Sequence, residues 1–297
     1  MAADKHHSRH RDNHHRAEAL AAKFPPLLVA AERVAATVAQ GVHGRRRVGQ
    51  GETFWQFRRY QQGDSARRID WRQSAKSQPV YIRETEWAAA ESVWLWRDAS
   101  FSMDYRSSTK LPSKAERAKL LLPALASLLI RGGEHVALLG SGRPPTAGRA
   151  VLNHLAEAME KVDDMTGLPA FEFLPRQGRI VLIGDFLSPL EEVEAAVSAF
   201  AARGVRGHLM QILDPAEETL PFSGRVRFQG MEGEQSVLIP RVESVREDYR
   251  RVFAGHHDGL AALARSLGWS FAVHHTDRPP ETALLALFMA LSVSVRN

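Results

Sequence analysis

Two apolar segments of this sequence each end in an aspartate, and they constrain the fold more than any other feature. Val93–Asp98 (VWLWRD) and Arg179–Asp185 (RIVLIGD) are short and apolar, a pattern typical of strands that are buried on both faces. Such strands belong to parallel sheets, and the carboxyl ends of parallel strands meet at one edge of the sheet. We therefore expect Asp98 and Asp185 to leave the same edge of one sheet.

Downstream of Ser92, strand patterns alternate with helix patterns. Strands are expected at 93–98, 135–140, 179–185, 208–213 and 270–275, and a hairpin at 225–239. Helices are expected at 113–131, 150–162, 190–203, 243–267 and from 280 onward. This alternation predicts an α/β fold of the Rossmann-like kind, a mostly parallel sheet flanked by helices. Before this main domain (92–297) we expect a disordered His-rich arm (1–16), a helical segment (17–44) and a small β-rich module (45–91).

The composition excludes several classes of site. The chain of 297 residues has no cysteine, which excludes disulfides, thiolate metal sites and cysteine nucleophiles. Its longest apolar stretches, near 120–130 and 284–291, are too short to span a bilayer. The polar N-terminus lacks the apolar core of a secretion signal. We therefore expect a soluble, cytoplasmic protein without a transmembrane segment.

One basic segment has an excess of positive charge equal to the net charge of the whole chain, +5. Residues 41–86 contain ten Lys or Arg against five Asp or Glu, a difference of five. Such a segment can meet nucleic acid, acidic lipid or an acidic protein face, or its arginines can pair with its own carboxylates. Trp55 and Tyr60 supply the aromatic rings that base stacking needs. No recognised nucleic-acid motif accompanies them, so a nucleic-acid partner is not expected.

Oxygen-bearing side chains follow the first of the two strands. Asp98, Ser100 and Ser102 form an Asp-x-Ser-x-Ser sequence, and Asp185 adds a second carboxylate at the end of the other strand. Carboxylate and hydroxyl oxygens suit a hard divalent cation such as Mg²⁺ that keeps some of its water. Held by so little formal charge, such a cation stays electrophilic and can accept an acidic side chain from a partner. The alternative is that the serines cap the following turn and Asp185 caps the next helix.

The same segments resemble a known fold and a known family. VWLWRDASFSM followed by RIVLIGDFLSP resembles the von Willebrand factor A-like fold with its metal-ion-dependent adhesion site. The run from Arg59 to Lys76 resembles the signature of the family catalogued as domain of unknown function 58. The signature residues are Gly63, Asp64, Arg67, Asp70 and Trp71. Leu213-Asp214-Pro215 with Glu217 matches a later landmark of that family, and the resemblance covers about 41–290.

The resemblance implies a set of metal ligands. These are Asp98, Ser100 and Ser102 after the first strand and Asp185 after the later one. The metal would be Mg²⁺, or else Mn²⁺ or Ca²⁺, and it would complete its shell with a carboxylate from a partner. A threonine ligand is also implied. Thr146, in a loop ahead of a helix, is the candidate for this threonine, and Thr166 is the second choice.

The resemblance also implies a function that is not enzymatic. Proteins of this kind are thought to act with MoxR-type AAA+ ATPases, and with other von Willebrand A-like proteins, in maturing or remodelling protein complexes. The Gly63–Trp71 run would then be a structural clasp between the small module and the main sheet, or a partner-binding surface. A metal-dependent phosphohydrolase is the alternative, and a basic nucleic-acid binder ranks below it. Neither a P-loop nor a Gly-x-Ser-x-Gly elbow occurs in the sequence.

Overall fold

The computed structural model describes residues 26–43, 53–61, 69–76, 79–86, 90–148, 150–160, 167–231, 233 and 235–293. Contacts divide the chain into two compact units. The larger contains Met1–Gly41 and Glu91–Asn297, and the smaller contains Val42–Ala90. The His-rich arm expected at 1–16 lies outside the described residues.

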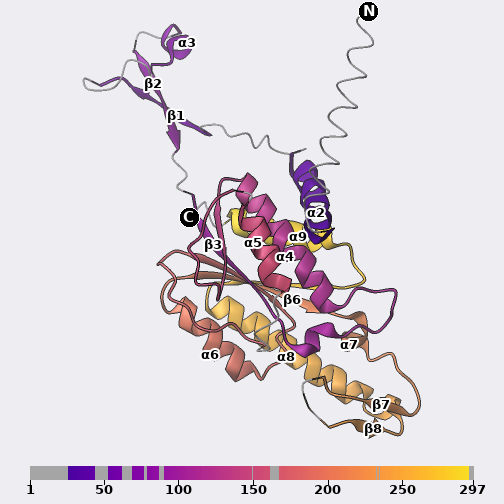
Figure 1. Ribbon diagram of the computed structural model, residues 1–297. Helices are drawn as coiled ribbons and strands as arrows, with labels where there is room; N and C mark the ends of the chain where they lie inside the picture. Colours follow the sequence, from indigo (N-terminus) through magenta and orange to yellow (C-terminus); the bar gives the residue numbers. More distant parts are fainter. Residues whose placement is uncertain are drawn as a thin grey trace, which may run out of the picture. The chain divides into compact units, whose positions relative to one another are not determined.

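A five-stranded sheet forms the centre of the larger unit, and all of its pairs are parallel (Figure 1). In spatial order the strands are β4 (His135–Leu138), β3 (Ser92–Arg97), β5 (Arg179–Gly184), β6 (Arg206–Leu213) and β9 (Ser270–His275). Every residue of β5 is buried, as expected for a strand that is covered on both faces. The structure confirms the predicted α/β fold with a parallel sheet between helices.

Helices cover both faces of this sheet (Figure 1). One layer contains α4 (Lys114–Arg131), α5 (Ala150–Glu160) and α9 (Pro280–Val293), and the other contains α6 (Leu190–Ala201) and α8 (Arg246–Ser266). Trp94 and Trp96 of β3 pack with Phe200 of α6 and Leu260 of α8 in one buried cluster. Because side chains alternate along a strand, Val93 and Leu95 face the opposite layer.

An additional helix, α2 (Pro26–His43), contacts α4 in the same unit. Glu32 of α2 accepts a hydrogen bond from the Ser127 hydroxyl at 2.8 Å and forms an ion pair with Arg131. None of the described helices is long and apolar enough to cross a membrane.

Several local predictions can be compared with the structure directly. The helix expected from Ser113 begins there, because the Ser113 and Glu116 side chains each accept a hydrogen bond from the backbone N–H of the other. The expected hairpin is present as β7 (Val226–Phe228) and β8 (Val237–Ile239). The helix expected from 243 instead starts with a short 3₁₀ turn, η3 (Val242–Ser244), before α8. Three of the described short helices were not predicted, η2 (Phe101–Asp104), α3 (Trp71–Ser74) and α7 (Pro215–Thr219).

The smaller unit contains an antiparallel strand pair, β1 (Thr53–Arg59) with β2 (Tyr81–Glu86). Asp70 begins a short helix, α3 (Trp71–Ser74), and its carboxylate accepts the Gln73 N–H at 2.9 Å. The Asp70 N–H donates to the Tyr81 carbonyl, also at 2.9 Å, so α3 is attached to β2. Trp71 is exposed. Gly63, Asp64 and Arg67 lie outside the described residues, and the clasp between the two units stays a prediction.

Candidate metal centre

The topology of the sheet places Asp98 and Asp185 at its switch point. The strand that follows β3 in the chain, β4, lies on one side of β3, and the strand that follows β5, β6, lies on the opposite side of the β3–β5 pair. The chain therefore leaves β3 and β5 in opposite directions. Ligands of open α/β sheets bind in the crevice beyond the carboxyl ends of such strands. The Asp98 N–H donates to the Ile183 carbonyl at 2.8 Å, which holds the two strand ends together at this crevice.

The four side chains predicted from the sequence are linked by hydrogen bonds at this edge. The Ser100 N–H donates to Asp98 Oδ1 at 2.8 Å, and the Ser100 and Ser102 hydroxyls lie 3.0 Å apart. The Ser102 hydroxyl donates to Asp185 Oδ2 at 2.6 Å. Asp98 and Asp185 are 0% and 2% exposed. The structure therefore brings together residues that are 83 positions apart in the sequence.

The alternative capping roles are not seen for these residues. Ser100 stands at the N-terminal boundary of η2, but its hydroxyl makes no capping hydrogen bond. The N-cap of α6 is Pro189, and Asp185 Oδ1 instead accepts the Leu187 N–H at 3.2 Å. The side chains at this edge are therefore directed toward one another and not toward helix ends.

A hollow of about 460 Å³ lies beside these residues. Its lining includes Ser100, Ser102, Asp185, Gly167, Ser188, Glu192 and Glu217. Asp98 Oδ2 is buried nearby and has no hydrogen-bond partner among the described residues. A buried carboxylate oxygen without a partner costs free energy, so this atom requires a proton, a water or a cation.

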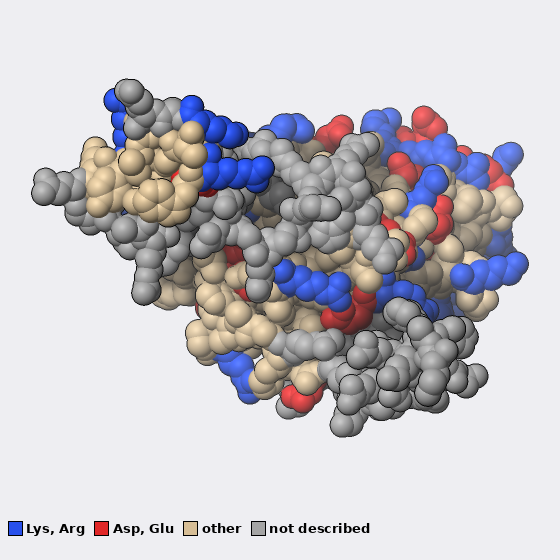
Figure 2. All heavy atoms as spheres, turned by 90° about the horizontal axis from the view of Figure 1, so that it is seen from above, with Lys and Arg blue, Asp and Glu red and all other residues tan. Residues whose placement is uncertain are grey.

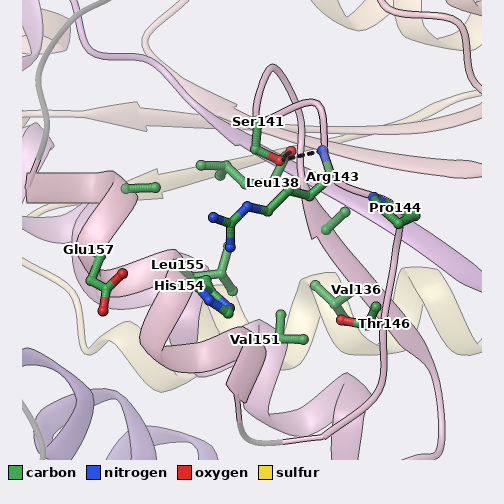
Figure 3. A pocket seen from close by; sticks show the side chains of 12 residues that line it. Val136, Leu138, Ser141, Arg143, Pro144, Thr146, Val151, His154, Leu155 and Glu157 are labelled. Carbon is green, nitrogen blue, oxygen red and sulfur yellow. Dashed lines mark hydrogen bonds between the residues drawn. The ribbon is translucent and has the colours of Figure 1, made fainter.

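Thr146 does not join this group. Its backbone pairs with Val136 of β4 in both directions, at 3.0 and 3.1 Å. Val136 pairs in turn with Val93 near the start of β3, and Asp98 follows five residues later, roughly 16 Å along the strand. Thr146 lines a separate hollow of about 240 Å³ between β4 and α5 (Figure 3). The second choice, Thr166, lies outside the described residues, but an ideal Cβ on its neighbour Gly167 would lie 3.8 Å from Asp98 Oδ2.

Lys114 is a charged residue of this centre that the sequence reasoning missed. It is the first residue of α4 and is 0% exposed. Its ammonium lies 2.8 Å from Asp185 Oδ2 and 2.5 Å from Glu217 Oε1. Burial lowers the pKa of Lys114, but the attraction of the two carboxylates outweighs burial and leaves the pKa raised. A lysine in the first turn of a helix is disfavoured by the helix dipole. This unfavourable position was the feature of the sequence that could have indicated a special role for Lys114.

Glu217 connects the centre to α7. Its second oxygen accepts the Asp214 N–H at 2.8 Å, and Asp214 caps α7 in return. Asp214 also accepts the Ser107 N–H at 2.8 Å, which attaches α7 to the loop that follows η2. The Tyr249 hydroxyl donates to the Glu217 carbonyl at 2.6 Å. Glu217 is therefore held at both its side chain and its backbone.

Helix α8 supports the loop after β5. The Gln211 side chain donates to the Asp185 carbonyl at 3.0 Å and accepts from His257 at 3.1 Å. His256 donates to the Phe186 carbonyl at 2.7 Å. Phe186 is buried with a left-handed φ of 52°, a conformation that costs about 1 kcal/mol or more in a bulky residue. These contacts hold Asp185 in place despite that strain.

The electrostatics of the centre fit a hard divalent cation. Burial, and then repulsion by Asp185, raise the pKa of Asp98 from 3.8 to about 7, although hydrogen bonds from Ser100 oppose the shift. Within the described ranges no cluster of three or more His, Cys, Asp or Glu has the arrangement of a metal site, so a cation here would rely on hydroxyls and water as well as carboxylate. The donors are all oxygen, which suits Mg²⁺, Mn²⁺ or Ca²⁺, and Asp98 Oδ2 has no hydrogen-bond partner in the part of the chain that the structure describes.

Comparisons with known proteins agree with the signature in the sequence. The family model described as "Protein of unknown function DUF58" matches residues 56–259. The chain belongs to the DUF58 family. Uncharacterized proteins of Mycobacterium tuberculosis and Mycobacterium bovis are 27% identical to this DUF58 chain over 246 residues, which are 77% of this chain and 76% of theirs.

Two solved structures are also similar to this DUF58 protein. One is an aerotolerance-related membrane protein from Bacteroides fragilis, with a TM-score of 0.40 and 16% identity over 69% of this chain and 100% of that one. The other is the conserved hypothetical protein BatB from Bacteroides thetaiotaomicron, with a TM-score of 0.39 and 16% identity over 70% of this chain and 100% of that one.

Proposed function

We propose that this DUF58 protein is a non-enzymatic adaptor whose metal centre binds an acidic side chain of a partner protein. The observation that carries the proposal is the buried Asp98 Oδ2, which has no hydrogen-bond partner in the described structure. The other oxygen of this carboxylate accepts the Ser100 N–H at 2.8 Å, and the Ser100 hydroxyl lies 3.0 Å from that of Ser102. An all-oxygen group with one unsatisfied carboxylate oxygen is suited to holding a hard cation without saturating it.

Each residue of the centre has a distinct part in this proposal. Asp98, Ser100 and Ser102 would hold the cation, and Asp185 would orient Ser102 by accepting its hydroxyl proton at 2.6 Å. The cation, when bound, would supply a Lewis-acidic position for a carboxylate oxygen of the partner. The hollow of about 460 Å³ gives such a carboxylate access to this edge of the sheet.

The surroundings of the hollow favour a protein partner. Phe101, Leu187 and Met231 are large apolar side chains that remain exposed. Leu187 and Met231 line the hollow itself, and Phe101 lies between the two serines in sequence. Aromatic residues and methionine are enriched at protein interfaces. By its resemblance to its family, we propose a MoxR-type AAA+ ATPase, with other von Willebrand A-like proteins, as partner in maturing or remodelling protein complexes.

A binding experiment tests the proposal. The tagged protein is incubated with a purified MoxR-type ATPase of the same organism in Mg²⁺ or in EDTA, and the retained ATPase is measured. We expect retention in Mg²⁺, loss in EDTA, and loss in Asp98→Ala at unchanged circular dichroism. Thr146→Val is the matched control and should retain the partner, since Thr146 lies away from the centre. Equal retention in EDTA would exclude a metal bridge.

The other two classes of function are tested in parallel. Turnover of a generic phosphoester that is lost in Asp98→Ala would replace the adaptor by a metal-dependent phosphohydrolase. Binding to mixed oligonucleotides that weakens steeply with salt would indicate a nucleic-acid binder. Figure 2 shows basic and acidic side chains intermingled over the right-hand part of the face that it displays, a mixture that does not favour a polyanion at that part of the surface.

A further inference from the structure

We propose that Lys114 is a resident counter-cation of the metal centre and sets the metal affinity through its charge. The inference rests on the proposed function, since it concerns how the centre binds its cation. The Lys114 side chain is entirely buried, and its ammonium contacts Asp185 at 2.8 Å and Glu217 at 2.5 Å. A buried ammonium in contact with two carboxylates stays positively charged, because both carboxylates favour its charged form.

Lys114 does not substitute for the metal. Its ammonium is bonded to Asp185 and Glu217, whereas Asp98 Oδ2 is left without a hydrogen-bond partner in the described structure. The lysine therefore fills the side of the centre that faces α7 and leaves the side that faces Asp98 for another positive charge. Tyr105 also lies on the lysine side, with its ring centre 5.9 Å from the ammonium.

The charges of the centre explain what the lysine contributes. In the metal-bound centre, with Asp98, Asp185 and Glu217 all ionised, the carboxylates carry −3. Lys114 reduces this to −2, the charge that one divalent cation neutralises. Without Lys114 the centre would carry −3 and attract cations more strongly. Lys114 and Ser102, one of the residues proposed to hold the cation, share one carboxylate, because Asp185 Oδ2 accepts both the ammonium and the Ser102 hydroxyl. By Coulomb's law each unit of charge at this range changes the affinity for a divalent cation by at least about tenfold, since tenfold is the value at the dielectric constant of water and a buried centre is screened less.

Glu217 is the ion-pair partner of Lys114, and substituting both residues separates the effect of the net charge on metal affinity from the effect of side-chain shape. Lys114→Met makes the charge −3, Glu217→Gln makes it −1, and the double variant restores −2 without restoring the ion pair. If charge sets the affinity, Mn²⁺ should bind Lys114→Met at least about tenfold more tightly than wild type and Glu217→Gln at least about tenfold more weakly. The double variant should then fall within about threefold of wild type, since its net charge is the same.

Isothermal titration calorimetry with Mn²⁺ alone, in chelator-free buffer, measures these affinities. Lys119→Met makes the same change on a less buried part of α4 and should leave the affinity unchanged. Circular dichroism and gel filtration confirm folding of each variant. If Lys114→Met does not fold, the double variant is compared with Glu217→Gln, and Mn²⁺ should bind the double variant at least about tenfold more tightly.

The outcomes separate this inference from the proposed function. Weaker binding in both single variants, with the double variant weakest, would mean that Lys114 shapes the centre and does not set its charge. If wild type binds Mn²⁺ and Asp98→Asn does not, while Lys114→Met equals wild type, the metal centre stands and the role of Lys114 fails. If only Lys114→Met binds, the role of Lys114 stands and wild-type metal dependence fails. Absence of binding in every variant overturns both.

Discussion

Gly184 is the residue whose substitution tests the geometry of the centre most directly. It is the last residue of β5 and lies against Asp98 on the neighbouring strand. A Cβ at Gly184 would lie 2.8 Å from the Asp98 Cβ and 3.1 Å from Asp98 Oδ2. Carbon atoms in contact normally lie about 3.5–4.0 Å apart. Gly184→Ala must therefore displace Asp98, and Asp98 is fully buried.

The size of the effect follows from two opposing contributions. Forcing one extra methyl group into a packed interior costs about 1–3 kcal/mol. Replacing glycine by alanine returns about 0.4–1 kcal/mol by restricting the unfolded chain. We expect a net destabilisation of about 1–2 kcal/mol, which lowers the Tm by about 2–8 °C in a domain of this size. Mn²⁺ affinity should also fall, because Asp98 can no longer keep both its hydrogen bond to Ser100 and its position at the hollow.

The assay pairs differential scanning calorimetry with Mn²⁺ titration. Gly255→Ala is the matched control, because a Cβ at this exposed position of α8 meets nothing within 4 Å. It should be neutral or stabilising by up to about 1 kcal/mol. An unchanged Tm in Gly184→Ala would refute the close approach of Gly184 to Asp98. A lower Tm with unchanged Mn²⁺ affinity would refute the part that Asp98 plays in holding the cation.

Three further predictions follow from the same contacts. The pKa of Asp98 is about 7 in the folded protein, against 3.8 ordinarily, so between about pH 4 and 7 the folded protein keeps a proton that the unfolded protein loses. The free energy of unfolding of the metal-free protein should therefore fall as the pH rises from about 4 to 7, by at most about 1.4 kcal/mol per pH unit. Urea unfolding at several pH values should show that this slope is missing in Asp98→Asn. Tyr249→Phe removes the 2.6 Å bond to the Glu217 carbonyl and should cost about 1 kcal/mol in the same assay. Thr146→Val should leave Mn²⁺ affinity unchanged in a calorimetric titration, and a loss would contradict the placement of Thr146 at β4.

The fold was predictable where one element carries a long, uniform pattern. The apolar runs of β3 and β5 and the capped helix from Ser113 lie within a residue or two of their expected bounds. The three short helices η2, α3 and α7 were not predicted, because four or five residues do not show a helical period. The path of the loop through Thr146 was also missed. It pairs with the edge of β4, and such pairing depends on tertiary contacts that no local pattern reports.

The centre was predictable to the extent that strand ends define it. Asp98 and Asp185 could be placed together because parallel strands end at one edge. The contact between Lys114 and Glu217 could not be predicted, because the two residues are 103 positions apart and meet only through the position of α7. Gly184 gave no signal beyond being a glycine in a strand, since its close approach to Asp98 depends on the β3–β5 register.

Helix α4 gives the molecule a mechanical connection. Its first residue, Lys114, is bonded to the carboxylates at the sheet edge, and its last turns hold α2 through Ser127 and Arg131. Over 18 residues a straight helix is about 27 Å long, and α4 has one interior proline, Pro123, a residue at which helices bend. A single helix therefore joins the contacts of α2 to the ammonium that contacts Asp185, so a bend at Pro123 would change the position of α2 relative to the place where a partner would dock.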